Sequence, residues 1–182
     1  IAVVGAGRWG RNLVRTLKEL GQLGAVVETD TETRKGLSAQ YPEIPTYPDL
    51  QSIQKESISA VAIATPVATH FNLAKAALSQ GFDVFVEKPM TPSAAEAKQL
   101  NTLAQQQGKI LMVGHLLLYQ PAIRWMASFL KEGGLGKLYS LHQERLNLGR
   151  VRSFENALWS LGTHDIAVIL NLVGKPPHRV SA

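Results

Sequence analysis

Several features that would narrow the function are missing from this sequence of 182 residues, beginning with cysteine. The absence of cysteine excludes disulfides, thiolate nucleophiles and thiolate metal sites, and it fits the reducing cytoplasm in which we expect the protein. Histidine and acidic residues form no cluster with the spacing of metal ligands, so we predict no metal site.

Long apolar runs and long basic runs are missing as well. The longest apolar stretch, residues 110–119, is interrupted by Gly114 and His115 and is too short to span a bilayer. The formal net charge is +5, but the basic residues are scattered and form no stripe interleaved with aromatic side chains. We therefore expect neither membrane nor nucleic acid as a partner. The excess charge fits either a solvated surface or a small ligand that carries phosphate.

The composition is that of a globular protein. Hydrophobic residues make up 45% of the chain and charged residues 18%. The length exceeds one typical domain but leaves too few residues for a second of ordinary size. The sequence starts inside an apolar run at Ile1, and residues 179–182 have the pattern of a strand that is just beginning. From these ends we expect a fragment of a longer protein.

Apolar runs alternate with helical patterns through the first part of the chain, which is typical of βαβ units and a parallel sheet. Strands are predicted at residues 1–4, 24–28, 59–64, 83–86 and 110–113. Helices are predicted at residues 11–20, 31–40, 69–80 and 93–107, the last three with Asp30, Thr69 and Ser93 as N-caps. The predicted fold is an α/β, doubly wound Rossmann sheet.

The pattern changes after Gly114. Residues 121–132 and 164–173 have helical periodicity, and residues 138–148 form a long, partly alternating stretch that predicts a strand of an open sheet. We predict a dinucleotide-binding domain over residues 1–116. Residues 117–182 are expected to be the first, truncated part of an α+β open-sheet substrate domain.

A glycine-rich loop, residues 5–10, follows the first predicted strand and precedes the first predicted helix. In this context Gly5 allows a tight turn, Gly7 allows a pyrophosphate to approach the backbone, and Gly10 allows close packing of helix and strand. The N-terminus of the helix supplies unpaired N–H groups and a partial positive charge for the phosphates. A dinucleotide site is predicted here, with a plain structural turn or a methyltransferase loop as the alternatives.

Glu28 ends the second predicted strand and identifies the kind of dinucleotide. A carboxylate at this position accepts hydrogen bonds from the adenosine ribose and repels a 2′-phosphate, which favours NAD over NADP. Asp30 is the rival carboxylate, although the role of N-cap suits it better. Arg34 weakens the preference if it pairs with a phosphate.

Together, several motifs resemble the Gfo/Idh/MocA oxidoreductase family, named for glucose–fructose oxidoreductase and inositol dehydrogenase. The motifs are Gly5-Ala6-Gly7-Arg8-Trp9-Gly10, Ala64-Thr65-Pro66 with His70, Glu87-Lys88-Pro89, Gly114-His115 and Gly162-Thr163-His164-Asp165. Their order and spacing match the family over essentially the whole chain. The resemblance implies NAD as the cofactor, a cis bond before Pro89, and a homo-oligomer for the full-length protein.

The resemblance also implies which residues contact the cofactor. They are Gly5, Gly7, Arg8, Trp9, Gly10, Glu28, Thr65, Pro66, His70, Glu87 and Lys88. For Trp9 the alternative is core packing, and for His70 it is a filling role in the first turn of a helix. Glu87 is expected to orient Lys88 or the cofactor.

Lys88 and His164 are the predicted catalytic residues, because oxidation of an alcohol needs a base for the hydroxyl proton. Many relatives carry an aspartate four residues before the histidine, where this chain has Ser160. Which of Lys88 and His164 is the base therefore stays open. Asp165 fits the first turn of a helix better than a catalytic role.

Within the family, residues 114–119, 145–152 and 155–160 resemble the branch that oxidises the 3-hydroxyl of UDP-N-acetylglucosaminuronic acid for surface polysaccharides. A sister activity on UDP-N-acetylglucosamine resembles this branch closely and stays as the alternative substrate. The predicted partner is thus a nucleotide-sugar. Its expected contacts are Arg145, Asn147, Arg152 and His164, because guanidinium groups suit a pyrophosphate or carboxylate and an amide suits a sugar hydroxyl. A dehydrogenase of a free sugar or polyol and a non-catalytic NAD-binding protein are the alternatives.

Overall fold

The computed structural model describes residues 1–53, 57–146 and 156–181. The chain divides into two compact units, Ile1–Gly114 and His115–Ala182. Each unit has its own set of elements, and each is described by itself.

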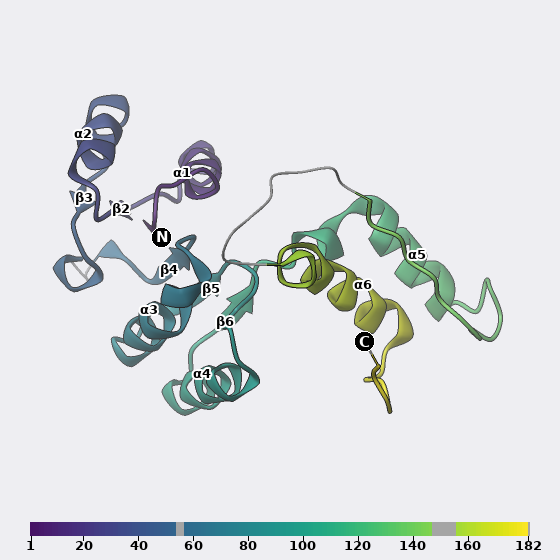
Figure 1. The fold of residues 1–182 in the computed structure, drawn as a ribbon. Coiled ribbons are helices and arrows are strands. Elements are labelled where there is room, and N and C mark those ends of the chain that lie inside the picture. Colours follow the sequence, from purple (N-terminus) through teal and green to yellow (C-terminus); the bar gives the residue numbers. More distant parts are fainter. Residues whose placement is uncertain (54–56, 147–155, 182) are drawn as a thin grey trace. The chain divides into compact units, whose positions relative to one another are not determined.

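The first unit is built on a six-stranded sheet in the order β3-β2-β1-β4-β5-β6 (Figure 1). All neighbouring strands pair in parallel. The strands are β1 (Ala2–Val4), β2 (Ala25–Val27), β3 (Thr46–Tyr47), β4 (Ala60–Ile63), β5 (Asp83–Val86) and β6 (Leu111–Val113). This order, with a reversal beside β1, confirms the predicted doubly wound Rossmann fold. Only the short β3 was not predicted, because two residues carry no usable alternation.

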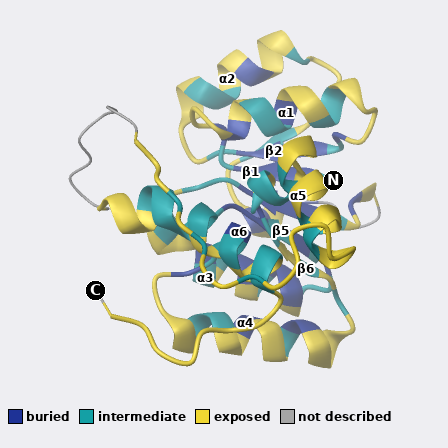
Figure 2. Cartoon of the chain, turned by 90° about the vertical axis from the view of Figure 1, so that its right-hand side faces the viewer, coloured by how far each residue is buried: buried dark blue, intermediate teal, exposed yellow. Residues whose placement is uncertain are grey.

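Helices cover both faces of this sheet. They are α1 (Gly10–Glu19), α2 (Thr31–Gln40), α3 (Val67–Ser79) and α4 (Ala94–Gln107). Alternate residues of a strand point to opposite faces, so Ala2 and Val4 join the apolar cluster under α3 and α4, whereas Val3 joins the cluster under α1 and α2. In Figure 2 the buried residues accordingly concentrate on the strands and on the inner sides of these helices.

The helix starts agree with the predicted caps in two of the three cases. Asp30 accepts from Thr33 N at 2.8 Å, and Ser93 accepts from Glu96 N at 3.2 Å. The expected role of Thr69 as an N-cap is wrong, because α3 begins earlier, at Val67. The Thr69 hydroxyl lies inside the first turn and donates to the Pro66 carbonyl at 2.7 Å.

In its described residues the second unit is helical. It contains the 3-10 helix η3 (Leu116–Tyr119), α5 (Pro121–Lys131), the π-helix η4 (Leu158–Gly162) and α6 (Thr163–Val173). Helices α5 and α6 match the predicted ones to within a residue at each end. The strand predicted over residues 138–148 is wrong over 138–146, which form no strand, while 147 and 148 lie outside the described residues. A strand needs a hydrogen-bonded neighbour, and no described segment of this unit supplies one.

Among the residues that the structure describes, none forms a helix that is both long enough and apolar enough to cross a bilayer.

Candidate active site

The glycine-rich loop connects β1 to α1, and packing within the chain accounts for two of its glycines. Gly5 has a φ of +88°, and a Cβ there would lie 2.7 Å from Thr65 Cγ2 and 3.0 Å from the Ala64 carbonyl oxygen. A Cβ on Gly10 would lie 1.9 Å from the Gly5 carbonyl oxygen. A side chain at either position would therefore displace backbone.

Gly7 is different, because nothing in the protein requires a glycine there. A Cβ on Gly7 would meet no atom within 4 Å, and its backbone is not in the left-handed region. The N–H groups of Gly5 and Ala6 are taken by Val27 O and by the Glu28 carboxylate. In the described part of the chain, the backbone N–H groups of Gly7, Arg8 and Trp9 have no hydrogen-bond acceptor. Open space beside unpaired donors at the start of α1 fits the pyrophosphate of a dinucleotide.

Glu28 follows β2 and binds the backbone of this loop. Its Oε2 accepts from Ala6 N at 2.7 Å, and its Oε1 accepts from Asp30 N at 3.1 Å. Both bonds fix the carboxylate at the carboxyl end of β2, where a carboxylate binds a ribose hydroxyl and repels a 2′-phosphate. The residues fit NAD at this end.

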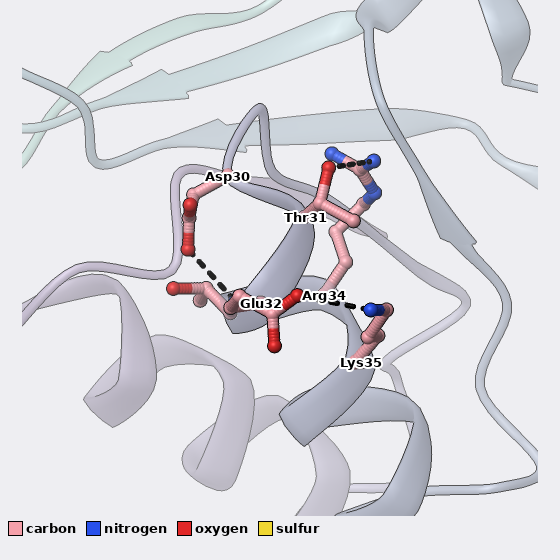
Figure 3. A network of polar contacts seen from close by, with 6 residues as sticks. Asp30, Thr31, Glu32, Arg34 and Lys35 are labelled. Atoms are coloured by element: carbon pink, nitrogen blue, oxygen red, sulfur yellow. Dashed lines mark hydrogen bonds and ion pairs between the residues drawn. The ribbon is translucent and has the colours of Figure 1, made fainter.

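Arg34 lies in the first turn of α2, with its guanidinium next to Thr31 (Figure 3). Its Nη1 donates to the carbonyl oxygens of Glu28 at 2.6 Å and Thr29 at 2.7 Å, and its Nη2 donates to Thr31 Oγ1 at 3.1 Å. The guanidinium is therefore engaged by the chain itself and fastens the β2–α2 turn. These bonds compete with a contact between Arg34 and the 2′-phosphate of NADP, which is the contact that would weaken the preference for NAD.

Glu87 directly follows β5, the strand between β4 and the edge strand β6. It is only 9% exposed. Its Oε1 accepts from the indole Nε1 of Trp9 at 2.5 Å, and its Oε2 accepts from Lys88 N at 3.3 Å. A Cβ on Gly114 would lie 3.0–3.1 Å from the Glu87 carboxyl atoms, so that side is closed by backbone. Burial raises the pKa of the Glu87 carboxyl, while the bonds from Trp9 and Lys88 oppose the rise.

Trp9 itself is 46% exposed, so it is not a core residue. Its indole N–H donates to Glu87, which follows β5. The alternative of core packing for Trp9 is thus ruled out, and contact with the cofactor stays a prediction.

His70, in α3, ties together two loops at this edge. It is 1% exposed, with Nδ1 2.9 Å from the Pro89 carbonyl oxygen and Nε2 2.8 Å from the Thr65 carbonyl oxygen. Both ring nitrogens are therefore occupied by the chain. His70 can therefore serve the site by holding the backbone of Thr65 and Pro89 in place.

Lys88 lies between these contacts and is half-buried. The Lys88–Pro89 bond is cis, as the resemblance implied. Thr65 contacts both Gly5 and His70, and Pro66 precedes α3 at the surface. The loops after β1, β4 and β5 therefore meet, and Glu28, after β2, joins them through its bond to Ala6 N.

The predicted residues of the second unit form a separate group. His164 lies half-buried in the first turn of α6. Asp165, in the same turn, accepts from Gln143 Nε2 and from Arg145 Nε, each at 2.6 Å. Asp165 thus acts as a helix N-terminal acid paired with Arg145, a pairing that sequence reasoning missed. Asn147 and Arg152 lie outside the described residues.

The packing of Gly114 against Glu87 is decided by the three-dimensional structure. Gly114 was recognised as part of a motif, but this packing could not be read from its neighbours in sequence.

Within the described residues, no group of three or more histidine or acidic side chains is arranged to hold a metal ion.

Comparisons with known proteins agree with this geometry. The profile of an oxidoreductase family with an NAD-binding Rossmann fold, GFO_IDH_MocA, matches residues 1–115. The chain is 31% identical to UDP-N-acetylglucosamine 3-dehydrogenase of Acidithiobacillus ferrooxidans over 99% of its own length and 56% of the relative. It therefore spans little more than half of that relative.

Solved structures of similar proteins have the same fold as this chain. A crystal structure of the Acidithiobacillus ferrooxidans UDP-N-acetylglucosamine 3-dehydrogenase superposes with a TM-score of 0.86 at 29% identity, covering 100% of this chain and 60% of that one. GenD2, a protein of gentamicin A biosynthesis solved in complex with NAD, gives a TM-score of 0.81 at 25% identity, covering 96% and 53%.

Proposed function

The chain belongs to the Gfo/Idh/MocA oxidoreductase family, and on that basis we propose that it is the NAD-binding part of a dehydrogenase that oxidises the 3-hydroxyl of a UDP-N-acetylhexosamine or of its uronic acid. The product would feed the synthesis of surface-polysaccharide sugars.

The observation that carries this proposal is the junction of the β1, β4 and β5 loops. The hydrogen bond between Trp9 and Glu87 and the two contacts of His70 place the Lys88 loop beside the phosphate loop. In open α/β sheets, ligands bind at this carboxyl edge, next to the point where the strand order reverses. A lysine is thereby held at the edge where a dinucleotide would end.

NAD, when bound, supplies the hydride acceptor at C4 of its nicotinamide. The chain must then bind and orient the sugar and take up the hydroxyl proton. Lys88 and His164 are the candidate bases, one in each unit. In the described part of the chain Arg145 makes its ion pair with Asp165 through Nε, so its Nη atoms are available for an anionic group of the substrate.

The similarity to the UDP-N-acetylglucosamine 3-dehydrogenase supports a UDP-sugar, because it extends through the second unit as well as the first. We expect the intact protein to reduce NAD with UDP-N-acetylglucosamine or its uronic acid, but not with inositol or glucose. NADH absorbance measures the reaction. Turnover with inositol or glucose alone would redirect the proposal to a free polyol or sugar.

Replacement of each candidate base tests the chemistry. We expect Lys88→Met and His164→Asn each to lower kcat by about a hundredfold or more, with NAD affinity changed much less. The variant that lacks the true base should also lose the pH dependence of kcat. Normal kcat in both variants would contradict the assignment of either residue.

A further inference from the structure

Glu87 is a buried acid that the proposed chemistry does not use. Both of its carboxylate oxygens accept N–H bonds, one from the Trp9 indole and one from the Lys88 backbone. This pattern suits the ionised carboxylate, which only accepts hydrogen bonds. A buried anion in this position is expected to interact with a positively charged group nearby.

The sheet order indicates which part of a dinucleotide lies near Glu87. Glu28 marks the adenosine side at the end of β2, and β4 and β5 lie on the opposite side of β1. A dinucleotide that crosses the sheet edge at β1, with its adenosine over β2, must direct its nicotinamide towards the ends of β4 and β5. Glu87 directly follows β5.

The environment of Glu87 fixes the position of its carboxyl group. Gly114 closes one side, and the half-exposed Trp9 donates its indole N–H to Oε1. Because water is largely excluded, the carboxylate interacts more strongly with nearby charges than an exposed one would. Burial, the largest influence, raises the pKa of Glu87, whereas the hydrogen bonds from Trp9 and Lys88 and the charges of Lys88 and His70 lower it, so the anion is the form expected above neutral pH.

We propose that Glu87, clamped by Trp9, is a positioning residue that makes the site prefer the oxidised, cationic nicotinamide ring over the reduced, neutral one. The inference rests on the cofactor placement of the proposed function and is independent of the sugar substrate. Preference for the oxidised form suits an enzyme that works in the direction of alcohol oxidation.

The size of the effect follows from electrostatics. Only the oxidised ring carries a positive charge, so a carboxylate near it stabilises one form and leaves the other almost unchanged. The attraction between the carboxylate and the cationic ring is weakened by solvent and partly offset by the charge of Lys88. We expect a preference of about tenfold from Glu87.

The test compares the dissociation constants of NAD+ and NADH, measured calorimetrically without any sugar at mildly alkaline pH. In Glu87→Gln the ratio of the constants should shift about tenfold towards NADH, which corresponds to about 1.4 kcal/mol. The matched control is Glu28→Gln, which removes a carboxylate at the adenosine end. It should weaken the binding of both forms by a similar factor and leave the ratio unchanged.

Trp9→Phe supplies a second, milder variant that keeps the carboxylate but removes its donor. The ratio should shift in the same direction by about threefold, because a hydrogen bond to a charged group is lost. Circular dichroism and thermal unfolding establish that each variant is folded, and Trp9→Phe decides the question if Glu87→Gln does not fold.

The outcomes separate the two proposals. An unchanged ratio in the folded Glu87 or Trp9 variants, or an equal shift in Glu28→Gln, overturns the role of Glu87 while NAD binding stands. If the unaltered protein binds neither form of the cofactor, the proposed function fails, and this inference fails with it.

Discussion

Replacing Gly7 and Gly10 by alanine, one at a time, should separate the demands of the fold from the demands of the ligand. Both residues belong to the same glycine-rich loop, and a sequence motif treats them alike. The structure does not, because a Cβ at position 10 would lie 1.9 Å from the Gly5 carbonyl oxygen, whereas a Cβ at position 7 would meet nothing within 4 Å.

The stability of the two variants should therefore differ. In Gly10→Ala the backbone of the loop must move, and overpacking of this kind costs about 1–3 kcal/mol or more, against a gain in helix propensity of at most about 1 kcal/mol. We expect a net loss of about 2 kcal/mol and a Tm lower by about 4–8 °C. In Gly7→Ala the free energy of unfolding should stay within about 0.5 kcal/mol of the unaltered protein.

The affinity for NAD should distinguish Gly7→Ala from the unaltered protein. The added methyl group occupies the space into which the pyrophosphate approaches the backbone, so the dissociation constant for NAD should rise by about tenfold or more. Thermal unfolding and calorimetric titration with NAD measure the two quantities. Unaltered NAD affinity in Gly7→Ala, or unaltered stability in Gly10→Ala, would refute the reasoning.

Three further predictions concern stability. Burial raises the pKa of Glu87, so between the ordinary pKa of 4.5 and the folded pKa the folded protein holds a proton that the unfolded chain releases. The free energy of unfolding should therefore fall as pH rises through this window, by at most about 1.4 kcal/mol per pH unit. Urea unfolding should show this slope, and Glu87→Gln should remove it. His70→Phe removes the imidazole that lies between the Thr65 and Pro89 carbonyl oxygens, to one of which the neutral ring donates its N–H, and should cost about 1–3 kcal/mol in the same assay; a loss below about 0.5 kcal/mol would contradict the role of His70 in holding these two loops. Ser93→Ala should cost about 1 kcal/mol, and Ser93→Asp should retain most of it, because only the second variant can cap α4.

The limits of the sequence-based reasoning have identifiable causes. The helices and strands of the first unit were predictable because alternation, apolar runs and capping residues are local signals. The strand predicted over residues 138–148 failed over its described part for the opposite reason. Alternation is compatible with a strand, but only a neighbouring strand can stabilise one, and the sequence of a segment does not say whether a neighbour is present.

The same division applies to the site. The sequence by itself determined the dinucleotide loop, the carboxylate at the end of β2 and the motif that contains Lys88, since each depends on a few adjacent residues. Only the tertiary structure decided that Trp9 donates to Glu87, 78 positions away, and that both nitrogens of His70 are occupied. The physical reason is the strand order, which brings the ends of β1, β4 and β5 to one edge of the sheet although the chain separates them.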